Sequence, residues 1–154
     1  MISESRNIAE IRRREGAVAH QCNCVTRGRA AGVARTIFSA FTYSDIYKNR
    51  TLDDLPGTCR VAMPPPGVVG KPIVCNLLSQ FFPGAADGDE ADKRLGWLDS
   101  SIKQMLSHPV VRHERVFFIP YRMGCCLGGG DWDEVRQILL ANEKNGIEFV
   151  CCVW

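Results

Sequence analysis

Four glycines and two cysteines stand within nine residues of the chain, in the stretch Gly-Cys-Cys-Leu-Gly-Gly-Gly-Asp-Trp at 124–132. An apolar run at 115–121 precedes this stretch, and an apparent helix follows it. Glycine lets the backbone approach a phosphate because it has no Cβ, and a helix N-terminus offers unpaired N–H groups to an anion. The stretch therefore predicts either an anion-binding loop or a plain connection between a strand and a helix.

A second segment of the same kind, residues 23–32, follows the apolar run at 17–23 and contains Gly28 and Gly32. In a parallel sheet both segments would lie at the carboxyl ends of strands, where α/β proteins bind their ligands. Two such loops facing one crevice would suit a diphosphate. The sequence has no GxxxxGK[ST], no GxGxxG with its later acidic residue and no GxSxG, which argues against the common NTPase, dehydrogenase and hydrolase classes.

Three polar side chains near these segments are candidates for catalysis. Asn23 stands at a strand end, where its amide could bond a ligand hydroxyl or orient a water. Asp131 could act as a base, or it could cap the helix that follows, and both roles are compatible. His20 lies in an apolar strand, where a histidine bonded inside the core is more common than a catalytic one.

The cysteines and aromatic residues around the glycine-rich stretch could either serve a site or pack in the core. A thiol at Cys125 or Cys126 would be a nucleophile if the nearby helix N-terminus lowered its pKa, but the CxxxxxR spacing of cysteine phosphatases is absent. Packing is the favoured reading for both cysteines and for the tryptophans at 97 and 132. Tyr121 and Phe81 are the better candidates for lining a cleft.

Length and composition fit one compact domain over residues 1–154, with 45% hydrophobic and 23% charged residues. The net charge of +2 and a pI near 8.1 argue against a nucleic-acid-binding surface. The three arginines at 12–14 are read as a solvated helix face. We also expect the domain to be a monomer.

Eight cysteines raise the question of compartment and metal binding. The N-terminal residues lack the pattern of a secretory signal, and no apolar run reaches the ~20 residues of a membrane span. We therefore expect a reducing compartment, the cytoplasm or the nucleus, with thiols packed as small apolar groups. The pairs are CxC and CC rather than CxxC, so neither a metal nor another cofactor is expected.

Apolar runs and helical periodicities alternate along the chain. Strands are expected at 2–4, 17–23, 58–63, 72–78, 115–120 and 147–154, and helices at 7–15, 33–41, 91–106 and 131–146, the last closed by Gly146. An acidic, glycine-bearing loop is expected at 83–90. This alternation predicts an α/β layered fold with parallel central strands.

Three ordered motifs resemble those of a known family. They are AVAHQCNCVTRGRAAGVARTIFSAF at 17–41, IVCNLLSQFFPG at 73–84 and FFIPYRMGCCLGGGDWDEV at 117–135. In this order and spacing they resemble macro domains, the ADP-ribose-binding modules, and most of all the stand-alone branch similar to ADP-ribose 1''-phosphate phosphatases. The resemblance covers residues 2–154 and implies a three-layer α/β/α domain with a mixed, mostly parallel central sheet.

The resemblance also implies roles for particular residues. Asn23 would contact the distal ribose, and the adenine end would lie near Asn7 and Ile8. The first phosphate loop would consist of Ala31, Gly32 and Val33. The second would consist of Gly124, Cys125, Cys126, Leu127, Gly128 and Gly129.

The sequence departs from the family pattern at several of these positions. Asn7 stands where the family usually has aspartate, so the charge that accepts the adenine amino group is missing. Cys126 stands where glycine is usual and adds a Cβ near the phosphates. The lysine and aspartate of the branch that removes ADP-ribose from glutamate are replaced by Ser79 or Gln80 and by Gly128, which argues against a lysyl adduct.

The expected function is binding of ADP-ribose with hydrolysis of ADP-ribose 1''-phosphate or a related ester, carried by Asn23, Asp131 and His20. Two alternatives are a non-catalytic ADP-ribose reader and an ADP-ribosyl hydrolase without the lysyl mechanism. A third is a module that binds RNA or poly(ADP-ribose) through the arginines at 12, 13, 14, 27 and 29. ADP-ribosylated macromolecules are further expected partners, and a membrane is not.

Overall fold

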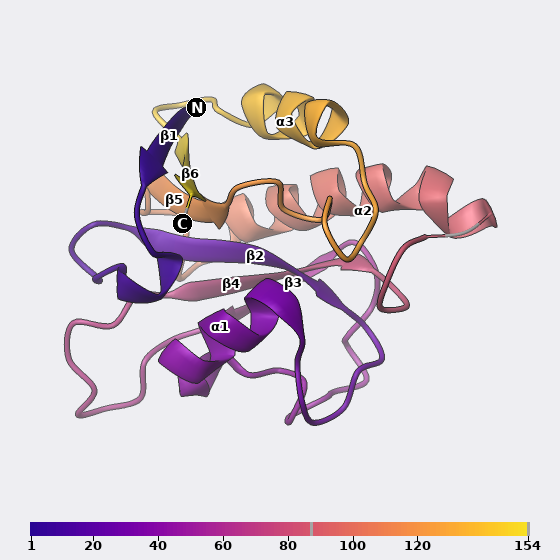
Figure 1. The fold of residues 1–154 in the computed structure, drawn as a ribbon. Coiled ribbons are helices and arrows are strands. Elements are labelled where there is room, and N and C mark those ends of the chain that lie inside the picture. The colour runs from indigo at the N-terminus through magenta and orange to yellow at the C-terminus, as the bar shows by residue number, and fades with distance from the viewer. Residues whose placement is uncertain (87, 154) are drawn as a thin grey trace.

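The computed structural model describes residues 1–86 and 88–153. The last residue of the expected strand at 147–154 and of the expected domain, Trp154, lies outside the described residues, as does Asp87 in the expected loop. The strands are β1 (Ile2–Ser5), β2 (Ala17–Asn23), β3 (Thr58–Ala62), β4 (Val74–Gln80), β5 (Val116–Pro120) and β6 (Glu148–Val153). The helices are α1 (Gly32–Ala40), α2 (Gly88–Ser107) and α3 (Trp132–Ala141), with 3-10 turns η1 (Ile8–Glu10) and η2 (Thr42–Ser44) (Figure 1).

A six-stranded sheet forms the centre, in the order β1-β6-β5-β2-β4-β3. All neighbouring strands are parallel except β3, which pairs with β4 in the antiparallel direction at one edge. Every residue of β4 is buried, as expected for a strand covered on both faces. The carboxyl ends of β2, β4 and β5 therefore lie at one edge of the sheet.

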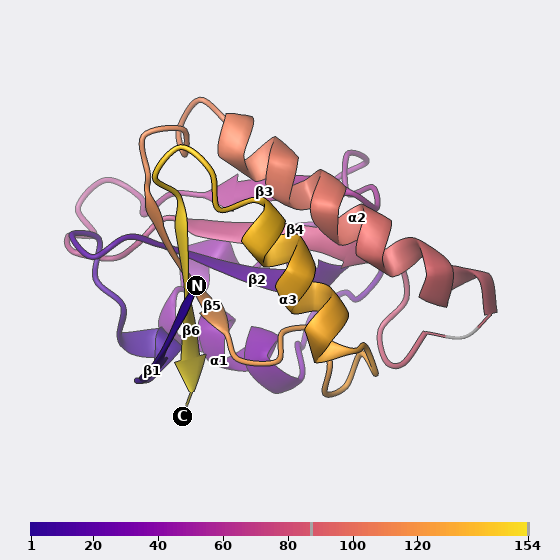
Figure 2. The ribbon, with the colours of Figure 1, turned by 90° about the horizontal axis from the view of Figure 1, so that it is seen from above.

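Helices cover both faces of this sheet. Figures 1 and 2 show α1 on one face and α2 with α3 on the other. Along β2, Ala17 and Ala19 belong to the core under α2 and α3, whereas Val18 and Cys22 belong to the core under α1. The alternation follows from the two-residue period of a strand. The three-layer α/β/α fold with a mixed, mostly parallel sheet is confirmed.

The segment at 7–15 differs from the expected helix. Only one 3-10 turn forms, because Asn7 Oδ1 accepts a hydrogen bond from Ala9 N at 3.0 Å and the chain then leaves the helical path at Ile11. Arg13 N donates to Gly70 O at 2.9 Å, which attaches the segment to the loop before β4. The three arginines at 12–14 are exposed, but they stand on a turn and not on a helix face.

Two helix ends also differ from expectation. The helix α2 begins at Gly88, so the last part of the expected loop at 83–90 is its first turn. The helix α3 ends at Ala141, with Asn142 as its C-cap. The Asn142 side chain donates to Ile138 O and to Asp99 Oδ1, both at 2.9 Å, which ends α3 against α2. Gly146 lies beyond the helix, in a turn with φ of +81°.

No helix within residues 1–86 and 88–153 is both long and apolar enough for a bilayer span.

Candidate functional site

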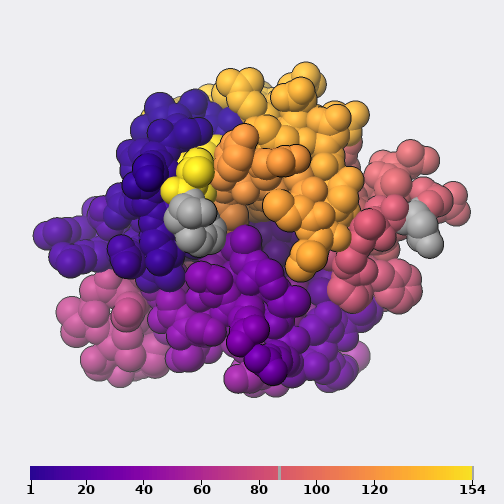
Figure 3. Space-filling view, viewed as in Figure 1, coloured from indigo at the N-terminus to yellow at the C-terminus, as the bar shows by residue number. Residues whose placement is uncertain are grey.

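A pocket of about 300 Å³ opens at the carboxyl ends of β2, β4 and β5. Its walls are the start of α1 and the loop at 121–130, whose segments lie side by side on the surface in purple and orange in Figure 3. The lining residues are His20, Gln21, Asn23, Thr26, Arg29, Ala31, Gly32, Val33, Ala34, Tyr47, Gln80, Pro83, Gly84, Pro120, Tyr121, Arg122, Met123, Gly124, Cys126, Leu127 and Gly128.

The first wall is the N-terminus of α1. Its N-cap is Ala31, in an extended conformation (φ −120°, ψ 166°), and an alanine has no side chain that could accept a hydrogen bond. The N–H groups of Gly32, Val33 and Ala34 have no acceptor among the described residues. These three residues line the pocket, so unpaired donors at the positive end of a helix dipole border it.

The second wall is a succession of tight turns at 121–130. Cys125 N donates to Arg122 O at 2.9 Å, and Gly130 N donates to Gly124 O at 3.0 Å. Within the described chain, the N–H groups of Cys126, Leu127 and Gly128 have no acceptor. This second set of free donors is what a backbone anion site requires.

The two walls touch each other through Leu127. A Cβ added to Gly32, which has a φ of +57°, would lie 3.0 Å from Leu127 Cδ1. Leu127 is 64% exposed, so its side chain spans the gap between the walls at the surface. The residues that carry both sets of free N–H groups line the same pocket.

Glycine is favoured at position 124 by its φ of +78°, which residues with a Cβ rarely adopt. An added Cβ would also displace the end of the Gln21 side chain. Gln21 Nε2 in turn donates to Gln80 Oε1, and Gln80 Nε2 donates to Phe82 O at 3.1 Å. Two side-chain amides thus form the floor of the pocket between β2 and β4, and the second wall packs directly on one of them.

The charges along the pocket are of one sign. Arg29 and Arg122 line it, and none of its described lining residues is an aspartate or a glutamate. Arg122 adopts φ of +56°, an uncommon conformation for a residue with a side chain, in the turn directly after β5. Together with the free N–H groups, these guanidinium groups favour an anionic ligand.

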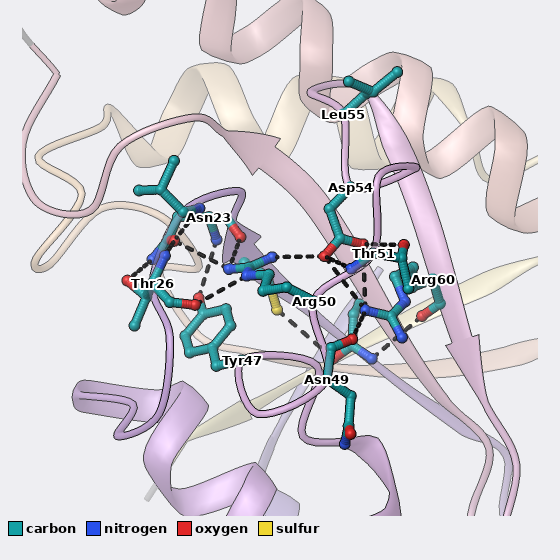
Figure 4. A network of polar contacts seen from close by, with 12 residues as sticks. Asn23, Thr26, Tyr47, Asn49, Arg50, Thr51, Asp54, Leu55 and Arg60 are labelled. Atoms are coloured by element: carbon teal, nitrogen blue, oxygen red, sulfur yellow. Dashed lines mark hydrogen bonds and ion pairs between the residues drawn. The ribbon is translucent and has the colours of Figure 1, made fainter.

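Asn23 is held at the end of β2 by hydrogen bonds on all sides (Figure 4). Its Oδ1 accepts from Thr26 N at 2.7 Å and Val25 N at 3.0 Å, and its Nδ2 donates to Thr26 Oγ1 at 2.9 Å. Tyr47 Oη accepts from Asn23 N at 3.0 Å. The amide is therefore fixed in one orientation. The second hydrogen of Nδ2 has no acceptor among the described residues.

A buried ion network lies behind Asn23. Arg50 donates to Asn23 O at 2.6 Å and to Thr26 O at 2.9 Å, and it pairs with Asp54 at 3.2 Å. Arg60 also pairs with Asp54 at 3.2 Å (Figure 4). The side chains of Arg50 and Asp54 are only 3% and 2% exposed. Two guanidinium groups against one carboxylate leave a net positive charge behind this side of the pocket.

His20 is a core histidine that borders the pocket. Its Nε2 lies 2.7 Å from Asn76 Oδ1, and Asn76 Nδ2 donates to Ser44 O and Arg60 O, which identifies Oδ1 as the acceptor. Nε2 therefore carries the proton. Burial lowers the pKa of His20 to about 4, against a smaller opposing effect of the Asn76 bond. His20 is neutral at pH 7.

Many of the residues expected at the site line this pocket. They are His20, Asn23, Ala31, Gly32, Val33, Tyr121, Gly124, Cys126, Leu127 and Gly128. Tyr121 is 45% exposed, and its ring packs edge-on against Trp132 at 5.4 Å. The roles that the sequence analysis gives these residues remain predictions.

Five expected site residues lie outside the pocket lining. Asn7 caps η1, and Ile8 is fully buried under α1. Cys125 is buried with its Sγ directed to Met123 O, and burial raises the pKa of this thiol to about 11, which opposes a nucleophilic role.

Gly129 and Asp131 complete this group. A Cβ at Gly129 would meet Ala85 Cβ at 3.1 Å, so Gly129 faces the loop after β4. Asp131 caps α3, where its Oδ1 accepts from Asp133 N at 2.8 Å and Glu134 N at 3.4 Å. Of its two expected roles, the structure shows the cap.

Sequence reasoning missed several lining residues, above all Gln21, Arg29 and Arg122 as pocket side chains. The alternation of β2 could have found Gln21, because His20 and Gln21 point to opposite faces and Gln21 is less buried than its neighbours. At the end of β4, Gln80 lines the pocket while Ser79 is 1% exposed and does not. Phe81 packs against the core under α1 instead of the cleft.

Within the described ranges, no three His, Cys, Asp or Glu side chains come together as a metal site would require. All eight cysteines are free thiols.

No family model matches the sequence. No curated protein matches it either. Solved structures do match its fold. The macrodomain of Mycobacterium tuberculosis DarG superposes with a TM-score of 0.65 over 98% of this chain and 95% of that chain, at 16% identity. The macrodomain of Thermus aquaticus DarG gives a TM-score of 0.63 over 99% and 97%, at 20% identity.

An alphavirus protein, P23pro-zbd, superposes with a TM-score of 0.67 at 19% identity, over 98% of this chain and 21% of that chain. At this level of identity the likeness concerns the fold and not the site. The chain therefore has the fold of the DarG macrodomains.

Proposed function

We propose that the chain binds ADP-ribose in this pocket, with the diphosphate between the start of α1 and the loop at 121–130. The observation that carries the proposal is that residues with two sets of free backbone donors line one pocket. The first set is at Gly32, Val33 and Ala34, and the second is at 126–128. A diphosphate has enough oxygen acceptors to use both sets at once.

The charges of the pocket support the same ligand. Arg29 and Arg122 favour anionic groups, and the described lining has no carboxylate that would repel them. The fold shared with the DarG macrodomains and the three sequence motifs support the adenosine and ribose parts of the proposal. Asn23, fixed at the end of β2, is the residue we assign to the distal ribose.

Hydrolysis of ADP-ribose 1''-phosphate is the second candidate, and the free Nδ2 hydrogen of Asn23 favours it. Such a reaction needs a group that orients water for in-line attack on phosphorus. Asn23 has this capacity at the pocket, whereas Asp131 has its Oδ1 engaged in the cap of α3. His20 is neutral at pH 7, and its Nε2 proton is already donated to Asn76 Oδ1. We therefore place Asn23 ahead of both residues as the one that would carry turnover.

The other enzymatic alternative is an ADP-ribosyl hydrolase without the lysyl mechanism. Gln80 at the end of β4 agrees with that restriction, because an amide does not form an imine with a ribose aldehyde. A polyanion module using the arginines at 12, 13, 14, 27 and 29 is favoured less. The first three precede β2, whereas Arg29 lines the pocket beyond the other end of β2, so the five arginines are divided between the two ends of this strand.

The experiment is a calorimetric titration with ADP-ribose followed by a phosphate-release assay on ADP-ribose 1''-phosphate. Binding with release that Asn23→Ala abolishes would support the hydrolase, and binding without release would make the protein a reader. A wild-type protein that binds neither compound would overturn the proposal.

A further inference from the structure

Arg94 of α2 joins three carbonyl groups from two separate loops. Its Nη1 donates to Gly84 O at 2.9 Å and to Gly128 O at 3.0 Å, and its Nη2 donates to Phe82 O at 3.0 Å. Gly84 and Gly128 both line the pocket. One side chain from outside the pocket therefore connects the loop after β4 with the second wall.

Glu90 completes this connection from one turn earlier on the helix. Its Oε2 accepts from Arg94 Nε at 2.8 Å, and its Oε1 accepts from Phe82 N at 3.3 Å. The side chains of Arg94 and Glu90 are 11% and 14% exposed. Charge-assisted hydrogen bonds in such a sheltered place are among the stronger ones in proteins.

The two loops have few other means of keeping their relative position. Both consist of turns and bends, with Gly84 in the loop after β4 and four glycines at 124–130, and glycine allows a wide range of backbone conformations. Gly129 packs against Ala85, but this is a contact between two small groups. The rigid helix α2, attached to both loops through Arg94, supplies a fixed point for them.

We infer that Arg94 is a positioning residue that holds the ribose side of the pocket in its binding conformation. The inference rests on the proposed function for the identity of the ligand. The loop at 82–84 follows β4, which pairs with β2 as far as Asn23 and Gln80. The wall that Arg94 holds is therefore on the side of Asn23, where we place the distal ribose.

The position of Arg94 predicts a difference between ADP-ribose and ADP. ADP carries the diphosphate but lacks the distal ribose, so it should depend less on the loop at 82–84 than ADP-ribose does. Loss of the Arg94 bonds should weaken ADP-ribose more than ADP. A general loss of stability would weaken both ligands alike.

Arginine is suited to this place where lysine is not. A guanidinium presents five donors in a planar fork, so it can reach Glu90 and three carbonyl groups together. A lysine ammonium has three donors at one point on a flexible stem. Arg94→Lys should therefore keep the charge and restore only part of the binding that Arg94→Met loses.

The test uses the full chain with Arg94→Met, Arg94→Lys and the control Lys103→Met. Lys103 pairs with Asp99 four residues earlier on the same helix, but the pair is 67% and 35% exposed. Calorimetry with ADP-ribose and with ADP gives the ratio of affinities. Hydrogen exchange of the ligand-free proteins is measured by mass spectrometry on peptides covering 81–86 and 124–130. It reports how well ordered each of the two loops is.

We expect Arg94→Met to weaken ADP-ribose binding by about tenfold or more, the equivalent of one lost charge-assisted hydrogen bond. ADP binding should weaken by a smaller factor, because ADP contacts only the second wall and not the loop at 82–84, and Arg94 holds both. Exchange should accelerate in both loops, and Lys103→Met should match wild type. Unchanged exchange in both loops would overturn the inference, as would equal loss of both ligands. If wild type binds neither nucleotide, the proposed function fails, and the exchange data alone decide whether Arg94 positions the loops.

Discussion

The absence of a capping side chain at the start of α1 leads to the most direct test of the pocket. Ala31 already has the extended conformation of an N-cap residue, so Ala31→Asp can accept hydrogen bonds from the free N–H groups of the first turn. We expect this change to stabilise the fold by about 1 kcal/mol, which raises Tm by about 2–4 °C in a protein of this size.

The same substitution should abolish ligand binding. The new carboxylate would take the donors that we assign to the diphosphate, and a carboxylate about 4 Å from a phosphate charge costs about 4 kcal/mol at an effective dielectric constant of 20. Even part of this energy reduces ADP-ribose affinity by about a hundredfold. Calorimetric titration measures the affinity, and a thermal melt of the same sample measures the stability.

Ala31→Asn is the matched control. Asparagine caps a helix about as well as aspartate but has no charge, so it should raise Tm equally and reduce affinity less. Wild-type affinity in Ala31→Asp would show that no phosphate lies at the start of α1. An unchanged Tm in both variants would show that the donors of Gly32, Val33 and Ala34 gain nothing from a cap.

Three further predictions concern single residues. Asp131→Ala should lower Tm by about 2–4 °C through loss of the α3 cap while calorimetry gives an unchanged ADP-ribose affinity, and a weakened affinity would place Asp131 at the ligand. Gly28→Ala should cost about 1–2 kcal/mol in denaturant unfolding for its left-handed φ. Gly124→Ala should cost about as much, since the end of the Gln21 side chain can move away from the added Cβ, but it should also impair ADP-ribose binding, which Gly28→Ala should not; equal affinities of the two variants would contradict this. Because burial lowers the pKa of His20 from 6.5 to about 4, the unfolded chain binds more protons between these values, and His20 should cost the fold about 3 kcal/mol as pH falls from 6.5 to 4. In urea unfolding, His20→Gln should lose about 3 kcal/mol less unfolding free energy than wild type over this pH range. Equal losses in the two proteins would contradict a buried, neutral histidine.

The strands and the layer order were predictable because their physical cause is local. Each apolar run at 17–23, 72–78 and 115–120 is too long and too apolar to remain exposed, and their alternation with helices permits few arrangements other than a covered parallel sheet. The cap at Asp131 was also readable, since its acceptor and donors are neighbours in the sequence. The end of α3 was not, because Asn142 ends it through a bond to Asp99 in another helix.

The site was predictable as two loops but not as a set of side chains. Position at a strand end identified Asn23 and the glycine-rich stretch, because the carboxyl edge of a parallel sheet collects such segments. The orientation of each side chain depends on contacts between distant segments. Gln21 meets Gly124, Leu127 meets Gly32, and Arg94 meets Gly84 and Gly128. No periodicity along the sequence indicates these pairs.

The strand order also has a consequence for synthesis of the chain. The strand β2 lies between β4 and β5, so β2 meets its neighbour β5 only after about ninety intervening residues have been made. Until residues near 130 have left the ribosome, the start of α1 faces no second wall. A nascent chain can therefore form one half of the pocket but not the whole. A ligand that contacts both halves would bind only the complete pocket. By mass action it would therefore stabilise the folded protein relative to any partly folded intermediate.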